Sequence, residues 1–257
     1  MQHFRPGCAS IPRRRNGGRV RKDGIGVAER GDEYVRTFDC EAILFDLDGV
    51  LVDSTAVVVR TWRDWASHRG LDAERILENA HGRPTAETVR LFAPHLDADS
   101  EARELERMEA ENLDGVLKVD GARELLSALP VDGWTVVTSG TRALASSRME
   151  HAGLPLPERF VSADDVENGK PHPEAYLRGA EILGVHPEGC VVVEDAPSGV
   201  SSARSAGMRV VAVATTYRQD DLREADAVAS SLAKIRAFAL PESGTGGGPR
   251  FELGVMG

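Results

Sequence analysis

The stretch FDLDGVLVDS, residues 45–54, predicts more about this chain than any other part of its sequence. Asp46 and Asp48 follow the apolar run at 42–45, and Gly49 lets the chain turn sharply directly after them. A buried strand here would carry both carboxylates to the C-terminal edge of a sheet, where ligands collect in open α/β folds. One carboxylate could then attack phosphorus while the other transfers a proton. A lone D-x-D pair is more typical of a strand cap or a solvated turn, so other motifs must decide.

Composition and charge narrow the class of protein. The 257 residues can form one large domain, or a core with a smaller inserted one. The formal net charge is −10, although residues 1–38 carry nine Lys or Arg against four Asp or Glu. The rest of the chain is therefore strongly acidic, which argues against nucleic acid as a partner. A small anionic substrate is still compatible, because a local site can be positive within an acidic surface.

Cysteine use and hydropathy predict a cytoplasmic protein without a membrane partner. Cys8, Cys40 and Cys190 form no C-x-x-C pair, and an odd number excludes a complete disulfide framework. A reduced compartment is the natural setting for such a chain. No apolar stretch approaches the length of a membrane span, and no signal-peptide core follows the basic N-terminus. We also expect a monomer.

Short β-rich runs alternate with helical patterns from residue 39 onwards. The expected strands are 42–47, 134–138, 159–162, 190–194 and 209–214, and the expected helices lie near 121–129, 141–151, 173–184 and 197–206. Strand–helix alternation of this kind predicts an α/β fold, with a Rossmann-like parallel sheet covered by helices on both faces.

The spacing of the strands predicts the domain organisation. About eighty residues separate the first two strands, far more than one crossover helix needs. Residues 54–118 look wholly helical, so we expect a small helical cap inserted into a core made of 39–53 and 119–240. Residues 1–38 are expected to be a disordered basic tail, because they cannot bury enough apolar surface. Residues 241–257 are expected to be a flexible tail or an edge strand.

Two patterns within the expected cap have simple structural explanations. The acidic run at 101–111 is expected to be a solvated helix face, next to a short apolar stripe of Ala102, Leu105 and Met108. Trp62 and Trp65 are expected to belong to the core of the cap rather than to a sugar-binding platform.

Three further strand ends carry polar groups. Thr138 and Ser139 can present hydroxyl and N–H groups to a phosphoryl oxygen, although such residues are also ordinary helix N-caps. Lys170 precedes a proline that constrains its loop, so its ammonium group can be aimed at a fixed point, unless it is a surface lysine. Glu194 and Asp195 follow three consecutive valines. Acids brought near another carboxylate repel unless a cation lies between them, and hard oxygen ligands suit Mg²⁺.

Taken together, the acid pair, Thr/Ser, Lys and second acid pair resemble the haloacid dehalogenase superfamily of phosphotransferases, and the match runs from about 41 to 235. The strings HGRPTAETV (81–89), VVTSGTR (136–142), GKPHPEAYLRGA (169–180) and VVVEDAPSGV (191–200) are similar to its β-phosphoglucomutase-like branch. Within that branch they are most similar to sugar-phosphate and glycerol-phosphate phosphatases. The resemblance implies a Mg²⁺-dependent phosphatase that hydrolyses a small phosphorylated sugar or polyol.

The resemblance also implies a role for each residue. Asp46 would be the nucleophile that forms an aspartyl-phosphate, and Asp48 would protonate the leaving alcohol and then activate water. Thr138 and Ser139 would bind phosphoryl oxygens, and Lys170 would pair with the phosphate and with the nucleophile. Catalysis would then consist mostly of positioning and electrostatics.

The metal and the substrate complete the implied site. Mg²⁺ would bind the Asp46 carboxylate, the Asp48 backbone carbonyl and Asp195, with Glu194 as a direct or an indirect ligand. Arg83, in the cap loop, would contact the substrate, since a guanidinium suits hydroxyl or phosphate groups. An exposed Arg83 without a partner is the alternative.

Two other functions remain open at this level. A hexose-phosphate mutase of the same fold would be expected to have a His on the first cap helix, where this chain has valines at 57–59. A non-enzymatic phosphoaspartate signalling module also combines acids, Thr/Ser and Lys, but it would be about half this length and lack the cap. Dehalogenases and phosphonatases of the superfamily lack an acid at the position of Asp48, so neither is expected.

Overall fold

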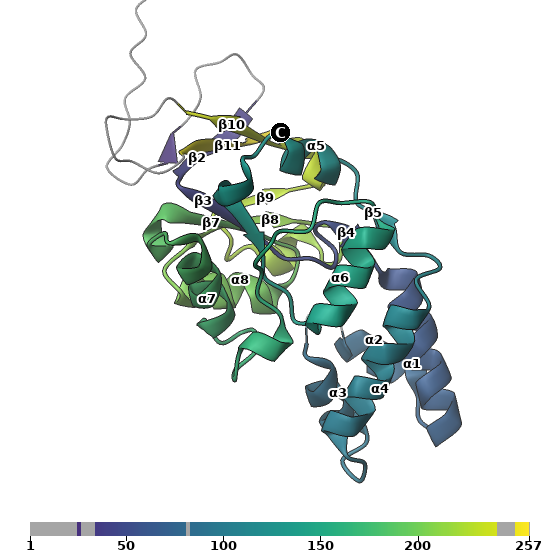
Figure 1. Cartoon of the computed structure of the whole chain (residues 1–257). Coiled ribbons are helices and arrows are strands. Elements are labelled where there is room, and N and C mark those ends of the chain that lie inside the picture. The colour runs from purple at the N-terminus through teal and green to yellow at the C-terminus, as the bar shows by residue number, and fades with distance from the viewer. Residues whose placement is uncertain (1–24, 27–33, 81–82, 241–249, 257) are drawn as a thin grey trace, which may run out of the picture.

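A five-stranded parallel sheet forms the centre of the molecule (Figure 1). The structure, a computed structural model, describes residues 25–26, 34–80, 83–240 and 250–256. The strand order is β6-β3-β7-β8-β9. Their bounds are β3 (Ala42–Phe45), β6 (Trp134–Val136), β7 (Cys190–Glu194), β8 (Arg209–Val213) and β9 (Ala227–Ala229). The expected α/β fold is confirmed, with the strand that precedes Asp46 at an interior position of the sheet.

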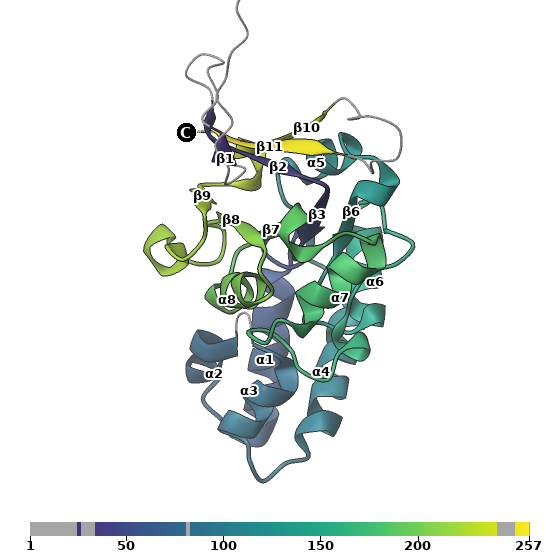
Figure 2. The same ribbon diagram turned by 90° about the vertical axis from the view of Figure 1, so that its left-hand side faces the viewer.

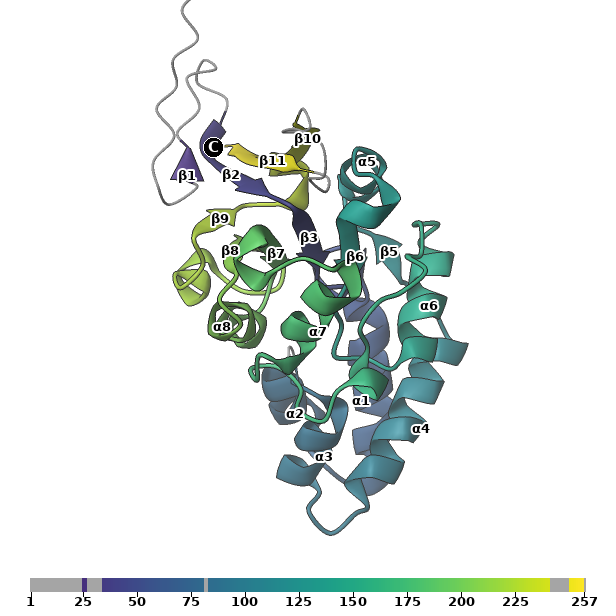
Figure 3. The same cartoon turned by 60° about the vertical axis from the view of Figure 1, so that its left-hand side comes forward.

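Helices cover both faces of this sheet. They are α5 (Ala122–Ser127), α6 (Arg142–His151), α7 (Glu174–Leu183) and α8 (Pro197–Ser205). Ile43 and Phe45 of β3 pack into one hydrophobic core with residues of α5 and α6, while Ala42 and Leu44 pack into a second core with residues of α7 and α8. Successive side chains of a strand point to opposite faces, so a strand buried on both sides is apolar throughout. Figure 3 shows α6 on one side of the sheet and α7 and α8 on the other.

Two parts of the sheet differ from expectation. The segment 159–162 makes only an isolated bridge between Val161 and Val137, because Ser162 caps a 3₁₀ turn directly afterwards and the chain leaves the sheet. Strand β9 was not expected, since three residues are too few to produce a recognisable apolar pattern.

A second sheet joins the two ends of the chain (Figure 2). It is antiparallel, with the order β1-β2-β11-β10. The strands are β1 (Ile25–Gly26), β2 (Tyr34–Cys40), β10 (Ile235–Ala239) and β11 (Phe251–Met256). The expected tail boundary at residue 38 is therefore wrong, because β2 begins at Tyr34 and Phe38 is completely buried. The rest of the expected tail, apart from β1, lies outside the described residues.

Residues 251–256 differ from both alternatives expected for 241–257, of which 241–249 and 257 lie outside the described residues. β11 lies between β2 and β10, so it is an interior strand rather than an edge strand or a frayed end. Phe38 of β2 lies opposite Leu253 of β11, and both side chains are fully buried. The pairing joins segments more than two hundred residues apart, which local sequence patterns do not reveal.

Four helices form the cap at the opposite end of the molecule (Figures 1 and 2). They are α1 (Thr55–Arg69), α2 (Ala73–Ala80), α3 (Thr85–Phe92) and α4 (Ala98–Glu111). The cap has its own core, in which Trp62 and Trp65 meet edge to face at 5.4 Å, as expected. The interval 54–118 is not wholly helical, however. It ends in β5 (Leu117–Lys118), which pairs with β4 (Val52–Asp53) where the chain enters and leaves the cap. In the described part of the chain, no helix is both long and apolar enough to span a membrane.

The β2–β11 pairing makes a testable contribution to stability. Phe38→Ala should lower the free energy of unfolding by about 3–5 kcal/mol, because it leaves a cavity among buried side chains. Phe238→Ala is the matched control. Phe238 of β10 is 44% exposed, so this substitution should lower the free energy of unfolding far less. Urea denaturation of both variants checks the difference. Equal losses would mean that β2 does not pack as described.

Candidate active site

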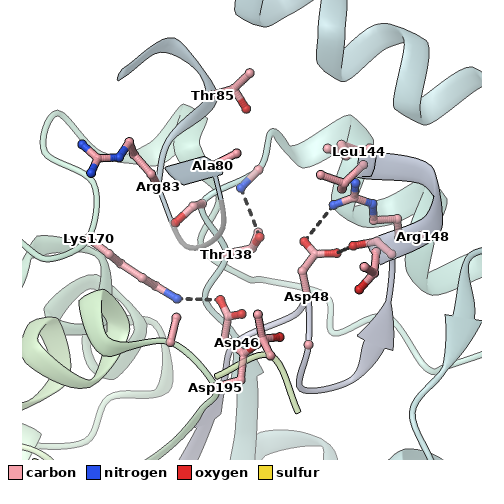
Figure 4. A pocket seen from close by; sticks show the side chains of 18 of the residues that line it. Asp46, Asp48, Ala80, Arg83, Thr85, Thr138, Leu144, Arg148, Lys170 and Asp195 are labelled. Carbon is pink, nitrogen blue, oxygen red and sulfur yellow. Dashed lines mark hydrogen bonds and ion pairs between the residues drawn. The ribbon is translucent and has the colours of Figure 1, made fainter. Parts of the chain in front are cut away.

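All four predicted motifs meet at the C-terminal edge of the parallel sheet, beneath the cap (Figure 4). Asp46 follows β3, Thr138 follows β6, Asp195 follows β7, and Lys170 comes from the loop before α7. They surround a cavity of about 140 Å³ that is closed on its other side by residues of α1, α2, α3 and α4. Parallel strands bring their carboxyl ends to one edge, which is why residues so far apart in sequence converge.

Lys170 is the positive centre of the site. Its ammonium group lies 2.5 Å from Asp46 Oδ1 and 2.8 Å from Glu194 Oε1, and it donates to the carbonyl oxygen of Val137 at 3.1 Å. Only 4% of its surface is exposed. Burial lowers the pKa of Lys170, but the charges of Asp46 and Glu194 outweigh it and raise the pKa well above its usual value. The side chain therefore stays charged between the two carboxylates.

Both carboxylate oxygens of Glu194 are engaged by protein donors. Oε1 accepts hydrogen bonds from Lys170 and from the hydroxyl of Tyr176 at 3.0 Å. Oε2 accepts from the backbone N–H groups of Asp195 and Ala196 at 2.7 and 2.9 Å. A carboxylate with so many donors has little capacity left for a metal ion. This arrangement favours Glu194 as a support for Lys170 and Asp195 rather than as a direct ligand.

The donor set fits a divalent metal ion. The buried carboxylates of Asp46, Glu194 and Asp195 have oxygens within 4.8 Å of one another, and Asp46 and Asp195 are the two that can act as direct ligands. Burial raises the pKa of Asp46 to about 7, with Lys170 opposing the rise and Glu194 adding to it. Burial and the charge of Glu194 also raise the pKa of Asp195. The cluster holds more negative charge than one ammonium group balances, and hard oxygen ligands suit Mg²⁺.

Two glycines in the motifs are required by this close packing. A Cβ atom on Gly49, which has φ +82°, would lie 1.9 Å from Asp195 Oδ2. A Cβ atom on Gly199, at the start of α8, would lie 1.6 Å from Glu194 Oε1. A side chain at either position would push a carboxylate out of the site, which explains why glycine follows each acid pair.

The side chain of Asp48 points to a different set of partners. Its Oδ1 accepts a hydrogen bond from Ser54 Oγ at 2.7 Å, and its Oδ2 lies 2.8 Å from Arg148 Nη1. Arg148 Nη2 in turn lies 2.6 Å from Glu109 Oε2. Burial raises the pKa of Glu109 to about 7, and the charge of Arg148 opposes this rise. Both carboxylate oxygens of Asp48 are thus engaged by protein groups, which leaves its backbone carbonyl as the group that the family resemblance implies for the metal.

The remaining predicted residues also line the cavity. Thr138 is 4% exposed, and its hydroxyl accepts a hydrogen bond from the N–H of Gly140 at 3.1 Å, while Ser139 lies beside it. Arg83 is exposed and donates from Nε to the carbonyl of Asn79 at 3.3 Å. Figure 4 shows it across the cavity from Arg148. His81 and Gly82, which precede it in the cap loop, lie outside the described residues.

Ser54, Arg148 and Glu109 were not expected to belong to the site. The expectation of a solvated face for 101–111 is wrong at Glu109, which is 6% exposed. The available signal was its spacing from Ala102 and Leu105, which places the three residues on one buried face of α4. A glutamate on the same face of the helix as these apolar residues indicates a buried carboxylate, which requires a buried partner.

Comparison with known proteins agrees with this architecture. The family model for haloacid dehalogenase-like hydrolases matches residues 43–213. Hexitol phosphatase A of Escherichia coli (strain K12) is 45% identical over 207 residues, which cover 79% of this chain and 96% of that protein. Glycerol-1-phosphate phosphohydrolase 2 of Saccharomyces cerevisiae is 36% identical over 195 residues, covering 71% of this chain and 78% of its own length.

Solved structures with the same architecture include a β-phosphoglucomutase and CbbY. The β-phosphoglucomutase of Clostridium difficile superimposes with a TM-score of 0.66 at 26% identity, covering 76% of this chain and 92% of its own. CbbY of Rhodobacter sphaeroides, solved in complex with phosphate, superimposes with a TM-score of 0.67 at 25% identity. The match covers 76% of this chain and 96% of CbbY. The family match spans the four motifs and the cap. The chain therefore belongs to the haloacid dehalogenase-like hydrolase family.

Proposed function

We propose that this protein is a Mg²⁺-dependent phosphatase that hydrolyses a small phosphorylated sugar or polyol through an aspartyl-phosphate. The observation that carries the proposal is the convergence of Asp46, Lys170, Thr138 and Asp195 around one cavity. Two of the relatives named above are a hexitol phosphatase and a glycerol-1-phosphate phosphohydrolase. A cavity of about 140 Å³ suits an ester of that size, since sites for drug-sized ligands occupy roughly 300–1,000 Å³.

The contacts of Asp46 support it as the nucleophile of the first chemical step. Lys170 holds Oδ1 of this carboxylate, which leaves the other oxygen to attack the phosphorus atom. A bond forms between Asp46 and phosphorus as the ester P–O bond breaks, and the leaving alcohol oxygen takes a proton from Asp48, which must enter this step as the neutral carboxylic acid. Lys170 and the hydroxyl of Thr138 stabilise the phosphoryl oxygens.

The second step regenerates the enzyme. Asp48, now ionised, takes a proton from water, and the resulting oxygen attacks the phosphorus atom of the aspartyl-phosphate. The bond between Asp46 and phosphorus breaks, releasing inorganic phosphate and the free carboxylate. A Mg²⁺ ion held by Asp46, Asp195 and the carbonyl of Asp48 would neutralise phosphate charge when bound.

Helix α1 of the cap lacks the proton-transfer residue that the mutase alternative predicts, although Glu106 and Glu109 of α4 also line the cavity. The residues of α1 that line the cavity are Thr55, Val58 and Trp62, and none of them can exchange a proton near neutral pH. A mutase must return a phosphoryl group to a second hydroxyl, which calls for a proton acceptor on the cap side. Thr55 and the two apolar residues provide no such acceptor on this helix.

Removal of the nucleophile is the direct test of the covalent route. Asp46→Asn should abolish turnover by several orders of magnitude, because an amide of nearly the same shape cannot act as the anionic nucleophile. Phosphate release from glycerol 1-phosphate measures the effect. Asp53→Asn is the matched control, since Asp53 is exposed and lies seven residues further on, outside the cavity. A D46N protein with activity within tenfold of the parent contradicts the mechanism.

Metal dependence follows from the carboxylate cluster. Exhaustive treatment with EDTA should remove activity, and added Mg²⁺ should restore it, because the three acids have an excess of negative charge. Ca²⁺ should inhibit, since it prefers more ligands at longer distances and would displace the nucleophile. Phosphate release with each ion gives the readout, and full activity in excess EDTA rules out the metal site.

The cap loop should recognise the part of the substrate that does not react. Arg83→Ala should lower kcat/KM for the sugar or polyol phosphate by roughly one to two orders of magnitude, the effect of one charge-assisted hydrogen bond. Nitrophenyl phosphate, which offers no hydroxyl groups, should change by less than about threefold. Arg90→Ala, an exposed cap arginine outside the cavity, serves as the control. Unchanged kinetics with both esters would show that Arg83 is only an exposed surface residue.

A further inference from the structure

Arg148 is a buried arginine shared by two carboxylates from different parts of the molecule. It lies on α6 of the core, and its two terminal nitrogens contact Asp48 Oδ2 at 2.8 Å and Glu109 Oε2 at 2.6 Å. Glu109 belongs to α4 of the cap, which packs against α6. Figure 4 shows the guanidinium directed at the carboxylate of Asp48. An unbroken chain of ionic contacts therefore runs from the cap to the proposed proton-transfer group.

The ionic contacts from Glu109 through Arg148 to Asp48 are buried, which restricts the orientation of the three side chains. Arg148 is 3% exposed and Glu109 is 6% exposed, so their ion pair is largely shielded from bulk solvent. Arg148 Nε is buried and has no hydrogen-bond partner within the described residues. All of its hydrogen bonding is thus directed through the two terminal nitrogens. A planar guanidinium that is fixed at one end by Glu109 presents its other end to Asp48 in one orientation.

We propose that Arg148 and Glu109 are positioning residues for Asp48. The packing of the cap against the core would then fix the orientation of the Asp48 carboxylate, which transfers the proton. The proposal rests on the phosphatase function proposed above and extends it to two residues outside the four motifs. Proton transfer requires the donor and acceptor to lie about 2.6–3.2 Å apart. A carboxylate that rotates freely about its side-chain bonds meets that condition for only part of the time.

The proposal predicts a dependence on the leaving group. The step reported by kcat/KM includes departure of the alcohol, which needs a proton when the product is an aliphatic alcohol. Nitrophenolate leaves with little need of protonation. Misorientation of Asp48 should therefore lower kcat/KM strongly for glycerol 1-phosphate and only slightly for nitrophenyl phosphate. A general loss of folding or of metal binding would lower both to the same extent.

The first experiment replaces the buried pair by apolar residues in the double variant Glu109→Leu/Arg148→Met. A buried ion pair exchanged for apolar side chains of similar volume commonly keeps a protein folded, whereas removal of one partner leaves an unpaired charge. We expect kcat/KM to fall by at least about 30-fold for glycerol 1-phosphate, with a loss at least tenfold smaller for nitrophenyl phosphate. Asp48→Asn, measured in parallel, gives the loss when the carboxylate is absent.

The second experiment tests the cap residue alone. Glu109→Gln keeps the shape of the side chain but removes its charge, and it should shift the ratio of the two kcat/KM values in the same direction. Glu101→Gln is the matched control, because Glu101 lies on the same helix and pairs with Arg69 within the cap, without a contact to Asp48. That variant should leave the ratio unchanged, even if it lowers stability.

The possible outcomes distinguish failure of the positioning role from failure of the proposed phosphatase function. If the parent protein hydrolyses neither nitrophenyl phosphate nor any of a panel of sugar and polyol phosphates, the phosphatase function fails and the positioning role fails with it. If the parent hydrolyses both kinds of ester and the double variant loses equal factors on the two, only the positioning role is overturned. The same holds if Glu101→Gln shifts the ratio as much as Glu109→Gln. A shift confined to Glu109 and Arg148 supports the positioning role.

Discussion

The ion pair of Lys170 with Asp46 and Glu194 is the interaction on which the rest of the site depends. Buried carboxylates are costly unless they are paired and hydrogen-bonded, and here two of them share a single ammonium group. That contact holds the loop before α7 against the ends of β3 and β7. It also orients Glu194 toward the start of α8, where Gly199 leaves space for the carboxylate. The charge that remains unbalanced is what makes the cluster suitable for a metal ion.

The part of the fold that follows from local sequence is the part that carries this chemistry. Within the expected strands, residues 42–45 and 190–193 are apolar throughout because both faces of each strand are buried. The acids that follow these runs come to one edge because the strands are parallel. The motif strings therefore located Asp46, Thr138, Lys170 and Asp195 in the site. The distances between these residues required the structure.

Elements that depend on distant partners could not be predicted in the same way. β2, with the sequence YVRTFDC, follows a basic segment that resembles a tail, and its pairing partner β11 lies more than two hundred residues further along the chain. Arg148 and Glu109 pose a similar problem. A charged residue on an amphipathic helix is normally solvated, and only the packing of α4 on α6 shows that these two charges face each other inside the protein.

The charge of the cap side bears on which ligands the cavity can accept. Glu106 and Glu109 of α4 line it, and the positive charge of Arg148 is already shared between Glu109 and Asp48. A second phosphate group placed there would face two carboxylates, and Arg83 is too exposed to offset them fully. Hydroxyl groups, in contrast, can donate hydrogen bonds to carboxylates without bringing negative charge. The cavity therefore combines a strongly polar floor for one phosphoryl group with a cap side that suits a neutral, hydroxylated remainder.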